Sequence, residues 1–337
     1  MSRPGCVASS SLPVGREAAE ACLAAGGTAI DAALAGYFAV AGAISWALLA
    51  PVSIVMAGSG TGTRFVDGRC RQPGKGIDKP VRYADESKVP PAVRAAVPGS
   101  ISAITIGAAP FARETTVALA SYGIQVALKE GATARAELIE RVGQAKAWAL
   151  LDRGFLAEMN ERVPRFEGAL LGQLDLEEVP AEVLAGQPAA NGPFSMARPP
   201  WADDPAMAGV EEGQRLFVLA ADNWGGLAGL VIEGAKHAIS LFGGEVDLPG
   251  LAVPLLKGVP RPKPGATLPM SAPIGILFDG ELPVSIAVST RRRLDLDHLD
   301  EALHEWGTSQ VSRAHDVVVV QAPPRREPEP APEIKLG

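Results

Sequence analysis

Residues 32–62 contain no charged side chain, and this run constrains the fold more than any other feature of the sequence. A helix that crosses a membrane needs roughly 20 apolar residues in succession. Here Gly36 and Gly42 interrupt the run, and Pro51 would break a helix near its middle. The run also ends in the glycine-rich stretch 58–62. The sequence therefore predicts a buried helix followed by a buried strand, and not a membrane span.

Helical and strand-like patterns alternate along the rest of the chain. Residues 14–25 place small and apolar side chains at helical spacing, and Gly26 and Gly27 provide a stop. Thr28 is predicted to cap the helix that follows. This alternation favours an α/β (α+β) layered architecture over an all-α or all-β one. The other predicted helices are 134–151, capped by Thr133, and 294–306, and the predicted strands are 52–57, 63–66, 216–221, 226–232, 237–242, 274–278, 284–289 and 316–321, with hairpin turns at Asp67-Gly68 and Asp279-Gly280.

Composition divides the chain into four parts. Residues 1–185 are predicted to form a lobe of helices and strands, and residues 214–322 a lobe dominated by strands. Residues 186–213 are rich in Pro, Gly and Ala with little periodicity, which indicates a linker or loop. Residues 323–337 form a Pro- and Glu-rich tail that is predicted to be disordered. We expect the two lobes to fold as one intertwined globular unit.

The charge balance and the cysteines bear on partners and location. The formal net charge is −7 and no basic stripe with interleaved aromatic residues is visible, so no nucleic-acid partner is expected. Cys6, Cys22 and Cys70 have neither metal-binding nor redox spacing, so the sequence predicts no metal site, no cofactor and a reducing compartment. Residues 1–13 lack the basic and apolar parts of a secretory signal, which favours a cytoplasmic location.

Four groups of short motifs follow one another along the chain. They are 7–10 (VASS) with 26–33 (GGTAIDAA), 58–62 (GSGTG) before a strand and Asp67-Gly68, 97–100 (VPGS), and 241–247 (LFGGEVD) with 268–273 (LPMSAP) and Asp279-Gly280. In this order they resemble the γ-glutamyltransferase family of N-terminal-nucleophile (Ntn) hydrolases. The resemblance implies an αββα four-layer sandwich. The part between Pro98 and Leu216 is shorter than in the usual family, so we expect a truncated member.

The chain departs from the family at the residues that carry its chemistry. The family's catalytic threonine opens a strand similar to 216–222, where this chain has Leu216, or Arg215 if the register differs by one. A leucine side chain has no proton to lose and no lone pair, so it cannot be the nucleophile of acyl transfer. Arg291 and Arg292 stand where the resemblance places the glycine pair of the oxyanion hole. Because autocleavage needs the same threonine, the resemblance also implies an uncleaved single chain.

Two charged groups are the main site candidates. Glu245 and Asp247 match the acidic pair that grips the substrate amine in the family, and both carboxylates can accept hydrogen bonds from an ammonium. The alternative is that they are solvated turn residues. Arg291, Arg292 and Arg293 could hold a sulfate, phosphate or carboxylate. Alternatively, they form a solvated charge run at the start of a helix.

Four further residues are weaker candidates. Asp222 could act as a base or could cap the turn after its strand. The pKa range of histidine suits a proton-transfer role for His237, and the alternative is a satisfied core or surface histidine. Ser271 and Ser59 are candidate substrate-binding residues. The stretch around Ser59 lacks the Lys-Ser/Thr ending of a phosphate loop, so close backbone packing is its alternative role.

These features lead to one function hypothesis and two alternatives. The hypothesis is a cytoplasmic enzyme of specialised-metabolite (antibiotic) biosynthesis that acts on an amine-bearing, anionic, amino-acid-derived small molecule. Intramolecular attack of the amine with loss of an oxyanion such as sulfate would form a small nitrogen ring, and a carboxylate base with a guanidinium clamp suffices for that reaction. The first alternative is an inactive scaffold or regulatory subunit of a hetero-oligomer, with a second protein subunit as its partner. The second is γ-glutamyl or amide acyl transfer or hydrolysis with an unusual nucleophile, such as Ser271 or Ser289.

Overall fold

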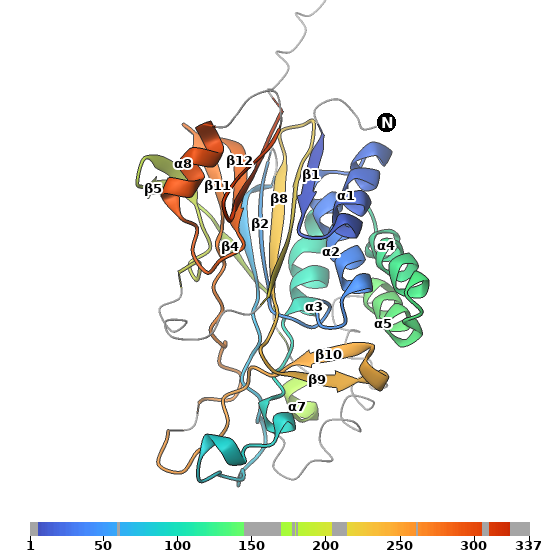
Figure 1. Ribbon diagram of the computed structural model, residues 1–337, viewed down its shortest axis with the longest axis vertical. Coiled ribbons are helices and arrows are strands. Elements are labelled where there is room, and N and C mark those ends of the chain that lie inside the picture. Colours follow the sequence, from blue (N-terminus) through green and yellow to red (C-terminus); the bar gives the residue numbers. More distant parts are fainter. Residues whose placement is uncertain are drawn as a thin grey trace, which may run out of the picture.

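The protein has four layers in the order helices, sheet, sheet and helix (Figure 1). The computed structural model describes residues 6–58, 61–144, 170–176, 179, 181–203, 214–260, 262–304 and 310–323. The predicted mixed fold with an αββα arrangement is confirmed.

The two large sheets are antiparallel and each contains six strands. The first sheet has the spatial order β1 (Val7–Ser10), β7 (Arg215–Ala221), β8 (Leu227–Glu233), β2 (Val52–Gly58), β3 (Gly62–Gly68) and β4 (Glu182–Ala185). The second has the order β13 (Val311–Ala314), β14 (Val317–Gln321), β12 (Leu282–Ser289), β11 (Ile274–Asp279), β6 (Phe194–Ala197) and β5 (Ala189–Asn191). A small hairpin, β9 (Ala238–Leu241) with β10 (Val246–Pro249), lies outside both sheets. The helices are α1 (Pro13–Ala25), α2 (Ala29–Ala43), α3 (Ser100–Ser102), α4 (Thr116–Lys129), α5 (Thr133–Gln144), α7 (Gln173–Leu176) and α8 (Leu296–His304).

Strands β7 and β8 are covered on both faces. Every residue of both strands is buried. Leu216 and Val218 pack with the helical layer, whereas Phe217 and Leu219 pack with the second sheet, because successive side chains of a strand point to opposite faces. β1 pairs with β7 and β2 pairs with β8, so segments from the two predicted lobes share one sheet.

Helix α2 is the centre of the helical layer. At its start Thr28 and Asp31 form a capping box, in which each side chain accepts a hydrogen bond from the other residue's amide. Further along, Gly42 lies against Gly123 of α4, and a Cβ on Gly42 would stand 2.3 Å from the Gly123 carbonyl oxygen. The predicted buried helix and strand of residues 32–62 are therefore present as α2 and β2. Within the described part of the chain, no helix has the length and apolarity needed to cross a bilayer.

The second sheet carries helix α8 on its outer face. Leu299 and Ala302 of α8 pack against Ala287 of β12 and Val319 of β14. The predicted hairpin 274–278 with 284–289 is present as β11 and β12, with Gly280 at its turn in the left-handed region (φ 59°). The second sheet and its helix thus complete the sandwich.

Three local predictions differ from the structure. Residues 186–213 were predicted to be a linker or loop, but β5 and β6 lie in this segment and extend the second sheet. Asp67 was predicted to lie in a hairpin turn, but it lies within β3, and its buried carboxylate forms an ion pair with Arg69 (2.9 Å). Thr133 was predicted to cap a helix, but it is the first residue of α5, and the amides after it donate to the carboxylate of Glu245. The remainder of that predicted helix, residues 145–151, and the tail from residue 324 lie outside the described residues.

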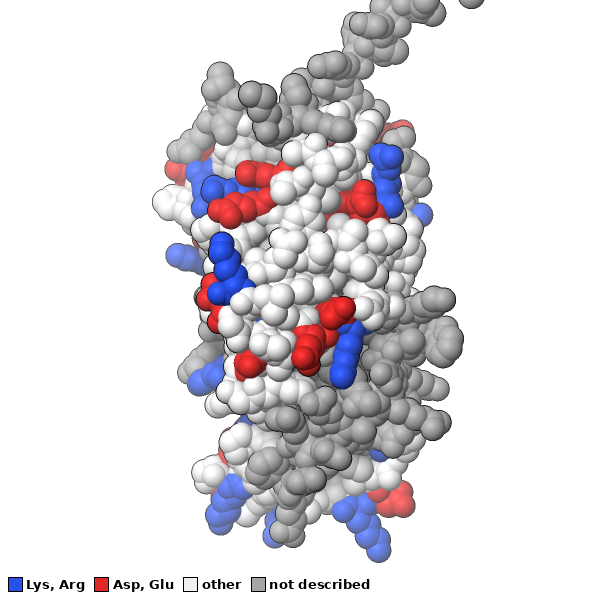
Figure 2. Space-filling model, turned by 90° about the vertical axis from the view of Figure 1, so that its right-hand side faces the viewer, with Lys and Arg blue, Asp and Glu red and all other residues white. Residues whose placement is uncertain are grey.

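Figure 2 shows the face that lies on the right-hand side of Figure 1, where the helical layer is. On the described part of this face, Lys and Arg side chains lie among Asp and Glu side chains. Over these residues the face shows no continuous basic patch of the kind that binds a phosphate backbone.

Candidate functional site

The start of β7 is the place to which the family resemblance assigns the nucleophile. The strand opens with Arg215, followed by Leu216. Arg215 lies on the same face of the strand as Phe217, which packs against the second sheet, whereas Leu216 faces the helices. Neither residue carries a hydroxyl or a thiol. In either register, the strand start therefore has no nucleophile for acyl transfer.

Arg215 forms a buried ion pair with Glu233. The two residues are opposite each other in the pairing of β7 with β8. Nη2 of Arg215 donates to Oε1 of Glu233 at 2.9 Å and to Oγ of Ser271 at 2.8 Å. The side chains of Arg215 and Glu233 are 1% and 9% exposed. A charged pair thus lies at the strand start, the region to which the resemblance assigns the nucleophile.

Two other nitrogens of the Arg215 guanidinium have no acceptor. Nε and Nη1 are both buried, and neither donates a hydrogen bond to any residue that the structure describes. Leaving a buried donor unpaired costs on the order of 1–3 kcal/mol, and more for a charged group. The guanidinium therefore presents donors that an anionic ligand would satisfy.

Arg292 lies close enough to Glu233 to influence its ionisation. Burial raises the pKa of the Glu233 carboxyl, and the charge and hydrogen bond of Arg215, followed by the charge of Arg292, partly offset that rise. Arg292 itself is half-buried. We refer to Arg215, Glu233, Ser271 and Arg292 as the strand-start cluster. Its carboxylate is a better proton acceptor than an exposed one, because its pKa is raised.

The residue before Ser271 is held by buried contacts. The Met270 Sδ lies 3.7 Å from the hydroxyl of Ser53. The indole nitrogen of Trp201 donates to the same hydroxyl at 2.7 Å. The guanidinium of Arg69 lies over the Trp201 ring, 4.6 Å from its centroid. These contacts fix the segment that carries Ser271.

The predicted acidic pair lies on the β9–β10 hairpin, and each carboxylate has partners within the protein. Glu245 accepts from the amides of Ala134 and Arg135 at the start of α5, at 2.7 and 3.3 Å. Asp247 accepts from the hydroxyls of Ser45 and Ser240, at 2.5 and 2.7 Å. Both residues therefore fasten the hairpin to the helical layer. A role in gripping an amine stays a prediction.

The other predicted residues lie in separate places. His237 is exposed at the start of β9, and its carbonyl accepts from Gly250. Arg291 is also exposed, with its Nε 4.0 Å from Asp316. The hydroxyl of Ser289 donates to the Asp316 carboxylate. Ser59 lies outside the described residues. Of the predicted site residues, the structure brings together Ser271 and Arg292.

Sequence reasoning missed Glu233 and gave Arg215 only as an alternative register. Arg215 stands at the start of one apolar strand and Glu233 at the end of the next. A charged residue at the end of a strand usually lies in solvent. A signal was nevertheless present, because two consecutive apolar runs joined by a short turn predict an antiparallel pair. In such a pair the start of the first strand lies opposite the end of the second, which places Arg215 opposite Glu233.

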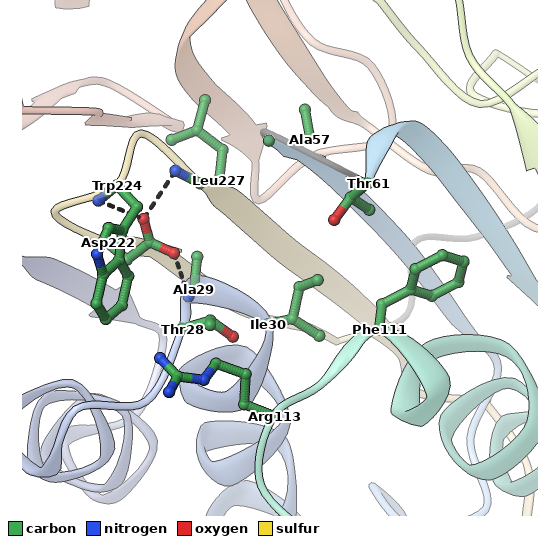
Figure 3. A pocket seen from close by; sticks show the side chains of 12 residues that line it. Thr28, Ala29, Ile30, Ala57, Thr61, Phe111, Arg113, Asp222, Trp224 and Leu227 are labelled. Atoms are coloured by element: carbon green, nitrogen blue, oxygen red, sulfur yellow. Dashed lines mark hydrogen bonds between the residues drawn. The ribbon is translucent and has the colours of Figure 1, made fainter. Parts of the chain in front are cut away.

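A cavity of about 300 Å³ lies at the opposite end of β7 (Figure 3). Asp222 follows the strand there and is 3% exposed. Its carboxylate accepts from the amides of Ala29, Trp224 and Gly226 at 2.8–2.9 Å. Asp222 therefore ties the start of α2 to the turn after β7, which is the capping role considered for it. Its role as a base stays a prediction.

The described residues contain no group of three or more His, Cys, Asp or Glu side chains that could hold a metal ion. The thiols of Cys22 and Cys70 are buried, and burial raises the pKa of each to about 12. Both are therefore neutral at physiological pH and behave as small apolar side chains.

No protein-family model and no curated protein matches this sequence, but solved structures do. The LmbA2991T421A structure is similar with a TM-score of 0.66, covering 93% of this chain and 83% of its own, at 12% identity. The LmbA2991HD structure has a TM-score of 0.59, covering 86% and 79%, at 14% identity. Cephalosporin acylase from Bacillus halodurans has a TM-score of 0.54, covering 84% and 76%, at 14% identity. At identities this low, the TM-scores show a shared fold and nothing beyond it. The chain therefore has the Ntn-hydrolase fold that the resemblance to γ-glutamyltransferases predicted.

Proposed function

We propose that this protein is an enzyme that binds an anionic, amine-bearing small molecule at the strand-start cluster and acts on it without forming an acyl-enzyme. One observation carries the proposal: Nε and Nη1 of Arg215 are buried without an acceptor among the described residues. An anionic group of the substrate would satisfy them, and the half-buried Arg292, whose charge acts on Glu233, would add a second positive charge. Neither Arg215 nor Leu216 carries a hydroxyl or a thiol, which supports a reaction that needs no nucleophile from these positions.

The cluster has the parts needed for ring closure with loss of an oxyanion. The substrate amine would attack the carbon that carries a sulfate ester, and the C–O bond would break with its electrons passing to the leaving sulfate. Glu233, whose pKa is raised by burial, would take the proton that the new ammonium releases. Arg215 and Arg292 would stabilise the charge that develops on the leaving oxygen. This assignment moves the amine-facing role from Glu245 and Asp247 to Glu233, and it fits the specialised-metabolite setting that the sequence analysis predicts.

L-Homoserine O-sulfate tests the reaction because it carries an amine, a carboxylate and a sulfate leaving group in one small molecule. We expect the protein to release sulfate, measured by ion chromatography, together with a four-membered nitrogen ring, measured by NMR. Arg215→Met combined with Glu233→Gln should abolish both. Arg16→Gln is the matched control, because Arg16 is exposed on α1, where it pairs with Glu20. Ring formation that survives in the double variant would contradict the proposal.

The Arg215–Glu233 pair also favours a second candidate function. The pair fills the strand start with the protein's own groups, as an inactive scaffold or regulatory subunit would. In that case a second protein would co-purify in fixed ratio, and the double variant would assemble with it normally. Acyl transfer is tested separately: incubation with a γ-glutamyl anilide and intact-mass measurement would show an acyl adduct on Ser271 or Ser289 if either were a nucleophile.

A further inference from the structure

The cavity at the far end of β7 is separate from the strand-start cluster. It lies beside Asp222, which follows the last residue of the strand, whereas Arg215 is the first. With a rise of about 3.3 Å per residue, the two ends of β7 are roughly 20 Å apart. A ligand in this cavity would therefore not touch Arg215.

One side of the cavity carries a cation without an anionic partner. The guanidinium of Arg113 lies over the Trp224 ring, 5.6 Å from its centroid, and Trp224 is 48% exposed. Among the described residues no carboxylate pairs with this guanidinium. Asp31 accepts a hydrogen bond from the Arg113 backbone amide, which fixes the segment but leaves the side chain's charge unpaired. The ring holds the cation at the cavity mouth.

Asp222 also lines the cavity, but backbone donors already bind its carboxylate oxygens. Its two oxygens accept the three amides described above, as the dashed lines in Figure 3 show. The start of α2 lies next to it, and the positive end of that helix dipole further offsets the carboxylate. The charge that a ligand would meet in the cavity is therefore that of Arg113.

The rest of the cavity lining is mainly apolar. Ile30, Phe111 and Leu227 contribute to it together with the small side chains of Ala29 and Ala57, and Thr28 and Thr61 add two hydroxyl groups. Figure 3 shows Phe111 on the side away from Arg113 and Trp224. An occupant that fits both sides has an anionic group at one end and an apolar body at the other.

The size of the cavity limits the occupant. Its volume is about 300 Å³. At about 30 Å³ for each water-sized volume, it holds roughly ten non-hydrogen atoms. We propose that this cavity binds a small amphiphilic monocarboxylate, with its carboxylate on Arg113 and its apolar body against Ile30, Phe111 and Leu227.

Phenylacetate and its neutral isostere phenylacetamide test this site, because they differ only in the charged group. Isothermal titration calorimetry on the full chain should show saturable binding of phenylacetate, at least about tenfold tighter than phenylacetamide, as expected for a charge-assisted hydrogen bond. Arg113→Gln should remove that difference, because it weakens phenylacetate alone. Since Arg113 is exposed, the variant is expected to fold, and thermal unfolding checks that it does.

Two controls separate this inference from the proposed function. Arg16→Gln, remote from the cavity, should leave phenylacetate binding unchanged. Arg215→Met with Glu233→Gln should also leave it unchanged, since that cluster lies at the other end of β7. The proposal is overturned if phenylacetate does not bind, if the acid and the amide bind equally, or if Arg113→Gln binds the acid as the wild type does.

Discussion

The two ends of β7 use buried charged side chains in opposite ways. At one end the carboxylate of Asp222 accepts three backbone amides and completes the junction of a turn with a helix. At the other end Arg215 pairs with Glu233 and Ser271, yet two of its nitrogens have no acceptor among the described residues. A fully paired buried group stabilises the fold, whereas an incompletely paired one reduces stability. We infer that Asp222 serves the scaffold and that Arg215 serves a ligand.

Replacing Asp222 should have the largest effect on stability. Asp222→Ala removes the acceptor of three amides, and we expect the free energy of unfolding to fall by about 3 kcal/mol in urea denaturation. Asp279→Ala is the control, because Asp279 is exposed at the β11–β12 turn, and it should change stability by less than about 0.5 kcal/mol. A loss at Asp222 no larger than the control's would remove the distinction between the two ends.

Ser271→Ala probes the opposite end with a smaller change. It removes one acceptor of Arg215 Nη2, so we expect a loss of about 1 kcal/mol in the free energy of unfolding. Ser121→Ala is a suitable comparison, because the Ser121 hydroxyl donates only to a carbonyl of its own helix. Equal losses for the two variants would mean that the Ser271 hydroxyl contributes nothing specific to the cluster.

Removing both charges of the strand-start cluster should change stability least. Arg215→Met with Glu233→Gln takes away the pair without leaving an isolated buried charge, so we expect the free energy of unfolding to stay within about 1 kcal/mol of the wild type, or to rise. Chemical denaturation measures this directly. A loss as large as that of Asp222→Ala would show that the pair is part of the scaffold.

The pH dependence of stability tests the environment of Glu233. An unperturbed glutamate has a pKa of about 4.3. Because burial raises the pKa of Glu233 in the folded state, the folded protein binds this proton more tightly than the unfolded chain does. Protonation of Glu233 therefore contributes to the free energy of unfolding. That contribution is fully present below about pH 4.3 and is lost as the pH rises through the folded-state pKa. Relative to Glu233→Gln, the wild type should therefore become less stable as the pH increases, and the opposite slope would contradict the assignment.

The sandwich could be predicted from the sequence because its evidence is local. The uncharged run contains most of α2 and all of β2, and another apolar run forms β7. In each case the residue pattern of the segment alone predicts the element and its burial. Together with motif order, these runs were sufficient for the fold. The short strands β5 and β6 were missed because they lie in a Pro- and Gly-rich segment and depend on the pairing of β6 with β11 and of β5 with β6.

The site was harder to predict because it depends on contacts between distant residues. Arg215 meets Glu233 only through the register of β7 with β8, and Ser271 reaches them from another part of the chain. Glu245 was chosen by motif similarity, but motif similarity cannot show that the start of α5 packs against its carboxylate. A sequence pattern identifies which groups are available, and the packing decides which of them are already occupied.

The central claim is that the strand start has changed from a nucleophile site to an anion site. Calorimetric titration of inorganic sulfate into the wild type and into the folded Arg215→Met, Glu233→Gln variant tests it most directly. We predict saturable binding by the wild type that is at least about tenfold weaker in the variant. Equal sulfate affinity in the two proteins would contradict the claim.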